Sequence, residues 1–159
     1  MKFSLLLLIF AGILWAEGSV EVHGTSTFHD WEMVSHSAVV HMKEKHNQIK
    51  ELKVSIVIET LKSGSDGMDE NAYKVFDVDR KSPIIFTLIE QKADGSLDGL
   101  ITIGKHEKRV TVIPDSIDNG VIRGSFKEKM SIFGVEPPTF FLGMMSTGDE
   151  IEIIYTISK

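Results

Sequence analysis

Hydrophobic and polar residues alternate along most of the chain after residue 16. Every second position is Leu, Val or Ile in residues 52–58, and a similar alternation runs through 122–132 and 150–157. Successive side chains of a strand point to opposite faces, so these runs predict strands with one apolar face and one largely polar face. Such strands are typical of antiparallel sheets, because strands buried in a parallel sheet are apolar on both faces.

Other segments also read as strands. They are residues 19–28, 36–44, 83–91, 97–104 and 108–114. Asp-Gly at 94–95, Asp-Asn-Gly at 118–120 and Thr-Gly-Asp at 147–149 separate several of the strands, because these residues favour the backbone angles of tight turns. Together the runs predict about eight antiparallel strands.

One segment, residues 67–77, departs from the alternation. Its apolar residues Met68, Ala72, Val75 and Phe76 recur at the spacing of one helix face. Carboxylates near its start suit the positive end of a helix dipole. The whole pattern therefore predicts a single all-β domain, an eight-stranded antiparallel barrel or a sandwich, with one short helix.

The first sixteen residues have the composition of an export signal. Lys2 precedes an uncharged apolar run from Phe3 to Trp15, and Ala16 supplies the small residue expected before a cleavage site. A membrane-spanning helix needs about 20 apolar residues, so the run favours a cleaved signal peptide over an anchor. We expect residues 1–16 to be removed and residues 17–159 to form the domain. The mature protein would then be periplasmic or secreted, with no membrane-spanning segment.

The composition excludes several classes of protein. The 159 residues contain no cysteine, which excludes disulfide scaffolds, thiolate metal clusters and thiol chemistry. The formal net charge is −6, and loss of Lys2 with the signal would leave 16 basic against 23 acidic residues, or −7. This balance argues against nucleic-acid binding, which needs a basic surface to displace counterions.

The histidines are the main candidates for metal ligation. They are His23, His29, His36, His41, His46 and His106. Zinc sites on strands often use His-x-His, which places two imidazoles on one face, and the sequence has no such pair. Gly-x-Gly-x-x-Gly and Walker sequences are missing as well. We therefore expect neither a metal site nor a cofactor.

Residues 29–32, His-Asp-Trp-Glu, form the densest polar and aromatic cluster. A histidine beside carboxylates can act as a general acid or base, but neighbours on an extended chain point apart. No Gly-x-Ser-x-Gly or Ser-x-x-Lys sequence supplies a nucleophile. The cluster favours a turn in which Trp31 plugs the barrel, and a hydrolase or metal enzyme built around His29 is the weaker alternative. We do not expect an enzyme.

Residues 133–145 combine Pro137-Pro138 with a strongly apolar stretch that includes Phe140 and Met144. The double proline ends regular structure. The segment is consistent with two arrangements. It folds over a barrel end and buries its own side chains, or it forms an exposed apolar patch that marks a ligand or partner site.

Taken together, several segments resemble the YceI-like family, in the branch whose opening reads GTSTxHDWE. The similar segments are residues 25–32, 61–64, 68–76, 82–86, 99–103, 108–112, 130–135 and 137–138. They run in order across almost the whole mature chain, and their order and spacing carry the resemblance. Two segments differ from the better-known branch. Residues 67–70 lack its Arg-Asp-His, and residues 104–110 lack the proline of its HGVTRPV.

The resemblance implies a lipocalin-like, eight-stranded antiparallel barrel, exported to the periplasm, that binds a polyisoprenoid or similar lipid chain inside. An eight-stranded barrel is just wide enough to hold one small ligand or to be filled by side chains. The expected ligand-binding residues are inward-facing and bulky: Leu52, Val54, Ile56, Ile58, Phe86, Ile101, Ile103, Phe126, Met130, Phe140, Ile151, Ile153 and Tyr155.

Two functions follow from these expectations. The first is a non-enzymatic carrier of an apolar small molecule, an isoprenoid or fatty chain. The second is a filled barrel that presents the 133–145 loop to a protein partner of the cell envelope. The oligomeric state stays open between a monomer and a homodimer.

Overall fold

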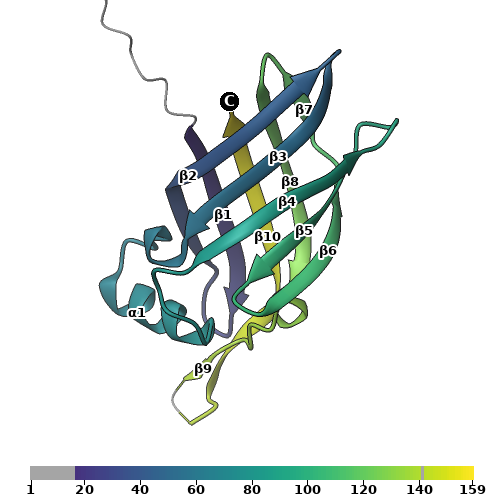
Figure 1. Cartoon of the computed structure of the whole chain (residues 1–159). Helices are drawn as coiled ribbons and strands as arrows, with labels where there is room; N and C mark the ends of the chain where they lie inside the picture. Colours follow the sequence, from purple (N-terminus) through teal and green to yellow (C-terminus); the bar gives the residue numbers. More distant parts are fainter. Residues whose placement is uncertain (1–16, 141) are drawn as a thin grey trace, which may run out of the picture.

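The structure, a computed structural model, describes residues 17–140 and 142–159, apart from the side chains of Glu17 and Phe140 (Figure 1). The predicted signal peptide, residues 1–16, lies outside the described residues. Each long run of alternating residues forms a strand, and the segment with helical spacing forms α1 (Asp66–Val75). The prediction of an all-β antiparallel domain with one short α-helix is therefore confirmed.

One antiparallel sheet makes up most of the molecule. Its strands are β1 (Glu17–Ser26), β2 (Trp31–Lys45), β3 (Gln48–Val57), β4 (Pro83–Gln91), β5 (Leu97–Ile103), β6 (His106–Val112), β7 (Ser116–Asp118), β8 (Val121–Lys129) and β10 (Met145–Ser158). The order across the sheet is β6-β5-β4-β3-β2-β1-β10-β8-β7, and β9 (Thr139–Phe140) pairs with β10 beside this path. Two 3-10 helices, η1 (Ile58–Thr60) and η2 (Met130–Phe133), follow β3 and β8.

The strand count corrects the prediction, because nine strands rather than eight form the main path. The additional strand, β7, has three residues, and β9 outside the path has two. Runs this short contain too few positions to show a period of two. The barrel is also incomplete. The sheet curls round, but its two ends, β6 and β7, are not paired with each other within the described residues.

Side chains, rather than backbone hydrogen bonds, bridge the open side of the sheet. Val110 and Val112 of β6 belong to one buried cluster with Met130 and Phe133 of η2. The turn after η2 brings Gly134 so close to the β5–β6 turn that a Cβ on it would lie 2.6 Å from the ring of His106. This glycine has φ 74°, a conformation that a larger residue adopts only with strain. Side-chain packing between β6 and η2 therefore covers the gap that unpaired β6 and β7 leave in the sheet.

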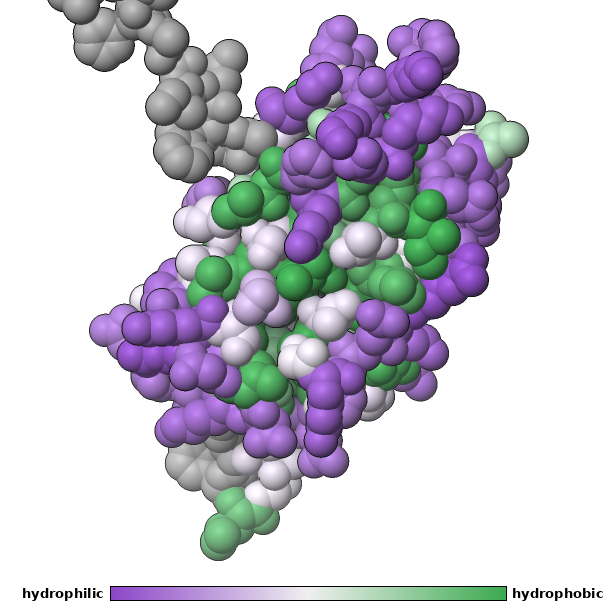
Figure 2. Space-filling model, viewed as in Figure 1, coloured by the Kyte–Doolittle hydropathy of each residue, from purple (hydrophilic) through white to green (hydrophobic). Residues whose placement is uncertain are grey.

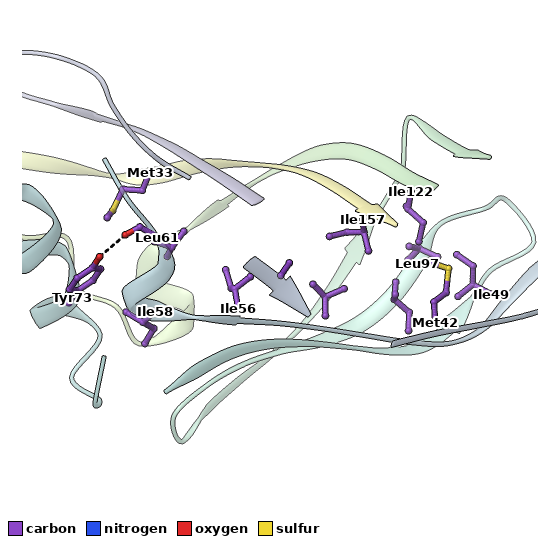
Figure 3. Close-up of a cluster of buried hydrophobic side chains, with 13 residues drawn as sticks. Met33, Met42, Ile49, Ile56, Ile58, Leu61, Tyr73, Leu97, Ile122 and Ile157 are labelled. Carbon is purple, nitrogen blue, oxygen red and sulfur yellow. Dashed lines mark hydrogen bonds between the residues drawn. The ribbon is translucent and has the colours of Figure 1, made fainter. Parts of the chain in front are cut away.

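The two ends of the half-barrel differ. One end, here called the closed end, is filled by apolar side chains of β2, β3, β5, β8 and β10 (Figure 3). These are Met42, Ile49, Leu97, Ile122 and Ile157. The C-terminus lies at this end, whereas α1 and β9 lie at the opposite end (Figure 1).

On the face shown in Figure 2, hydrophilic side chains gather at the top and the lower left, and apolar ones lie over the strands between them and again at the lowest tip, near β9. Among the described residues, none of the helices has both the length and the apolar character that a bilayer crossing requires.

Candidate ligand-binding site

The half-barrel encloses a cavity of about 800 Å³. Its walls come from the inward faces of the strands, with α1 and η2 completing them. Pockets that hold a small molecule usually measure about 300–1,000 Å³ and have mostly apolar walls. The interior is therefore hollow, and it is large enough for a long apolar chain.

Most of the predicted ligand-binding residues lie on the wall of this cavity. They are Leu52, Val54, Ile56, Phe86, Ile101, Ile103, Phe126, Met130, Ile151, Ile153 and Tyr155. The alternation places them there, because every second side chain of a curled sheet points inward.

The other two predicted residues are Ile58 and Phe140. Ile58 does not line the cavity. It is fully buried in η1, because β3 ends at Val57 and the strand alternation ends with it. There it belongs to the same cluster as Leu61 and Tyr73 (Figure 3). The side chain of Phe140 lies outside the described residues.

Further lining residues were not predicted as ligand contacts. Met68, Ala72 and Val75 of α1, and Phe76 directly after it, line the cavity. Their helical spacing was visible in the sequence, but it does not say which side of the sheet a helix covers. The strands contribute further side chains: Val20, Val22, Trp31, Met33, Leu97, Val112, Ile122 and Ile157. Alternation at Val20 and Val22 could have identified part of this set.

Glycines opposite aromatic rings keep the interior hollow. A Cβ on Gly24 would lie 2.2 Å from the ring of Trp31, and one on Gly99 would lie 2.5 Å from the ring of Phe86. Both distances are far below a van der Waals contact. The missing side chains therefore let these two rings lie against the wall instead of projecting into the cavity.

Tyr155 brings a polar group into the apolar region. Its hydroxyl is buried and has no hydrogen-bond partner among the described residues. Burial, and to a smaller extent the carboxylate of Asp115, raises the pKa of Tyr155 to about 12. The side chain is therefore uncharged at neutral pH, and its ring packs at a tilt against Phe126, with the ring centroids 6.4 Å apart.

All the other polar lining residues lie at the end opposite the closed end. They are Ser26, His29, Ser65, Asn71, Ser146 and Thr147, and we call this group the mouth. Each is exposed or half-buried. They come from the β1–β2 turn, from the start and middle of α1, and from the beginning of β10. A ligand therefore meets polar groups at the mouth and an apolar wall further inside.

The predicted His29 cluster forms part of the mouth. The Nδ1 atom of His29 lies 2.8 Å from the backbone carbonyl oxygen of Asp30. The indole N–H of Trp31 donates to the carbonyl oxygen of Thr25 at 3.1 Å, and its ring lines the cavity. The cluster thus brings a histidine and a tryptophan to the site, and the ring of the histidine is oriented by the main chain.

Hydrogen bonds fix α1 beside the mouth. The carboxylate of Asp69 accepts from the backbone N–H of Ser63 at 2.8 Å and from its hydroxyl at 2.7 Å. Burial opposes ionisation of Asp69, but these bonds and the nearby ammonium of Lys62 outweigh it and lower the pKa of the carboxyl. The hydroxyl of Tyr73 donates to the carbonyl oxygen of Leu61 at 2.7 Å (Figure 3).

The 133–145 loop divides between the two predicted arrangements. Phe133 and Val135 are buried and line the cavity. Leu142 and Met144, at the tip of the hairpin that joins β9 to β10, are fully or largely exposed. The first part of the loop therefore belongs to the wall and the second part to the surface.

Histidines and carboxylates lie apart from one another over most of the molecule. Within residues 17–140 and 142–159, no three His, Asp or Glu side chains are close enough to share a metal ion. His23 lies 3.0 Å from a carboxylate oxygen of Glu21 and 3.9 Å from one of Glu32. The contact with Glu21 is a hydrogen bond between two side chains of β1.

The same fold is found in other proteins whose structures have been solved. The chain is similar to BcnA of Burkholderia cenocepacia, with 17% identity and a TM-score of 0.74 over 89% of this chain and 96% of that one. It is also similar to the YceI protein of Campylobacter jejuni, with 19% identity and a TM-score of 0.56 over 85% of both chains. None of the curated proteins searched matches the chain.

A family model tests the chain more directly than these distant structural neighbours. The model described as the YceI-like domain matches residues 13–158, which is nearly the whole sequence. The resemblance to the YceI-like family is confirmed. The chain belongs to the YceI-like domain family.

Proposed function

We propose that this protein is an exported, non-enzymatic carrier that holds one long apolar molecule, an isoprenoid or similar lipid chain, in the cavity of its half-barrel. The observation that carries the proposal is the cavity of about 800 Å³, whose interior is lined by aliphatic and aromatic side chains. Polar lining residues gather at the mouth. Such a site can keep a chain away from water without a charged or reactive group.

The energetics are sufficient for useful binding. Burying about ten methylene groups contributes roughly 8 kcal/mol, which corresponds to a dissociation constant of about 1 μM before the costs of ordering the ligand. The wall needs little rearrangement, because its side chains belong to strands that are paired along their length. The proposal that the protein is exported rests on the signal-like residues 1–16. The proposal that it is not an enzyme rests on the lack of catalytic sequence motifs.

The hollow interior weighs against the alternative function. A filled barrel that serves as an interaction module requires a solid core, whereas the space between the walls is empty of side chains. The exposed side chains of Leu142 and Met144 are the part of the 133–145 loop that this alternative would still use.

Extraction of the purified protein tests the proposal. We expect an organic extract to contain a lipid that mass spectrometry identifies as a long-chain molecule, at close to one per protein. Added isoprenoids should raise the melting temperature of delipidated protein. An extract without lipid, together with no thermal shift from any isoprenoid or fatty chain, would exclude the carrier function.

Neighbouring isoleucines of β10 supply a matched pair of variants. Ile153 lines the cavity, whereas Ile154 points to the other face of the sheet and is not part of the lining. We expect Ile153→Trp to place an indole inside the cavity and to abolish the ligand-induced thermal shift. Ile154→Trp should keep it. Equal loss in both variants would indicate damage to the strand rather than to the site.

A further inference from the structure

The polar groups of the mouth bear on the head group of the ligand, whereas the carrier function concerns only its apolar chain. The side chains of the mouth supply four hydroxyls, one amide and one imidazole. Among the described residues that line the cavity, none is Lys, Arg, Asp or Glu. The lining therefore offers hydrogen bonds to a ligand but no ionised partner.

His29 lines this opening, and the hydrogen-bonding roles of its two ring nitrogens are defined. Its Nδ1 lies 2.8 Å from the carbonyl oxygen of Asp30. A carbonyl oxygen can only accept, so Nδ1 carries the proton and donates. In a neutral imidazole the other nitrogen, Nε2, is then an acceptor. Nε2 makes no hydrogen bond within residues 17–140 and 142–159.

Ser26, which also lies at the mouth, likewise uses its only hydroxyl proton in a hydrogen bond to the main chain. Its hydroxyl donates to the backbone carbonyl oxygen of His29 at 2.6 Å. The same oxygen accepts from the backbone N–H of His29 at 3.4 Å, so it has one acceptor lone pair left and no second proton to give. This side of the mouth therefore presents acceptors, and a ligand group that donates a hydrogen bond is its natural complement.

The charged side chains near the mouth do not favour an anionic group. Asp30 follows His29 and Asp66 follows Ser65, and both carboxylates are exposed. Like charges at close range repel one another. The cations of this region do not balance them. Lys62 and Arg80 are paired with carboxylates, and Lys74, like Asp30 and Asp66, lies outside the lining.

We propose that the ligand ends in an uncharged head group with a free hydroxyl, which donates to Nε2 of His29 while the apolar chain fills the cavity. This proposal rests on the carrier function. It names the ligand class as a long-chain alcohol, or a lipid with a free hydroxyl at one end. A phosphate, pyrophosphate or carboxylate head would meet no cation in the lining, and the exposed carboxylates of Asp30 and Asp66 adjoin the lining residues His29 and Ser65 in the chain.

Three probes with the same C20 chain test this class: geranylgeraniol, its methyl ether and geranylgeranyl pyrophosphate. Trp31 lines the cavity and is the sole tryptophan of residues 17–159. In delipidated protein that consists of these residues, its fluorescence therefore reports binding of the probe. We expect the alcohol to bind about three- to tenfold more tightly than the ether, which is the effect of one hydrogen bond. The pyrophosphate should bind more weakly than either.

A pair of histidine variants assigns the effect to one atom. His29→Leu should lower the affinity for the alcohol to that for the ether and leave the ether unchanged. His29→Gln, which keeps an acceptor, should restore part of the difference. His36 is exposed on β2 and does not line the cavity, so His36→Leu should change neither affinity.

The outcomes separate this inference from the carrier function. If the pyrophosphate binds as tightly as the alcohol or more tightly, or if His29→Leu leaves the alcohol's advantage over the ether intact, the head-group assignment is wrong although the carrier function stands. If none of the three probes, and no other apolar chain, binds or shifts the melting temperature, the carrier function itself is wrong.

Discussion

The closed end and the mouth of the same cavity are built in different ways. At the closed end, apolar side chains from both halves of the sequence meet, and each is between 1% and 7% exposed. At the mouth, polar side chains are exposed or half-buried and come from a turn, a short helix and the start of β10. The closed end resembles the core of any small protein, where each methyl group contributes to stability. The mouth contributes little burial and is free to serve recognition.

This comparison predicts that stability and binding can be changed separately. Substitutions at the closed end should lower stability strongly, whereas substitutions towards the mouth should mainly change ligand affinity or the docking of α1. The four predictions that follow run from the largest expected effect to the smallest.

Truncation at the closed end should have the largest effect. Ile122 is 1% exposed and packs among Leu97, Ile157 and their neighbours. We expect Ile122→Ala to lower the free energy of unfolding by about 2–5 kcal/mol, measured by urea denaturation, because it leaves a void in a packed region. Ile113 is 71% exposed, so Ile113→Ala should have almost no effect. A similar loss in both variants would contradict the distinction between packed and open regions.

A substitution between the two regions should affect both properties. The Cβ of Gly24→Ala would overlap the ring of Trp31, which must then move off the wall and into the cavity. We expect a loss of about 1–3 kcal/mol in unfolding free energy from overpacking, weaker binding of a C20 chain and altered Trp31 fluorescence. A Cβ on Gly67 would meet no atom within 4 Å, so Gly67→Ala is the control and should leave binding unchanged. Unchanged binding in Gly24→Ala would show that the ring has room to move elsewhere.

Removal of the unpaired hydroxyl of Tyr155 should stabilise the protein. A buried polar group without a partner costs about 1–3 kcal/mol, and the hydroxyl has no partner among the described residues. We expect Tyr155→Phe to raise the free energy of unfolding by about 1 kcal/mol in delipidated protein. Decreased stability would mean that the hydroxyl is satisfied by a group such as a buried water.

Acid should loosen the mouth before the closed end. Folding lowers the pKa of Asp69, so its stabilising contribution is present above the ordinary carboxyl pKa of about 3.9 and is lost as the pH falls through the lower, folded value. Hydrogen exchange of the α1 amides should then increase on acidification relative to that of β8 and β10. In Asp69→Asn this pH dependence should be smaller. Equal acceleration in all elements would show that acid acts through global unfolding.

Much of the fold could be predicted from the sequence because alternation is a local property. Every strand long enough to show the period of two was predicted, and the spacing of Met68, Ala72, Val75 and Phe76 predicted α1. The same reasoning placed most of the predicted ligand-binding residues on the cavity wall, because alternation determines which side chains share a face. It failed at Ile58, where the chain leaves the strand for η1, and at β7, which is too short to show a period.

The mouth could not be predicted, because it depends on contacts between distant segments. Thr27 and Ser146 are 119 positions apart in the sequence, yet hydrogen bonds between them join the β1–β2 turn to the start of β10. The sequence cluster around His29 indicated polar chemistry, but it did not show that the imidazole borders the cavity or that Nδ1 bonds to the main chain.

By itself, the sequence determined the all-β antiparallel class, the short helix, the family and the inward row of each long strand, because these depend on the period and order of residues. The tertiary structure decided that the sheet stays open between β6 and β7 and is bridged by η2, that the interior is hollow, and where its mouth lies. The physical reason is that volume and closure depend on how rows from different strands meet. Gly24 and Gly99 affect the volume, because they leave room for aromatic rings to lie against the wall. These contacts join different strands, so they can be identified only from the tertiary structure.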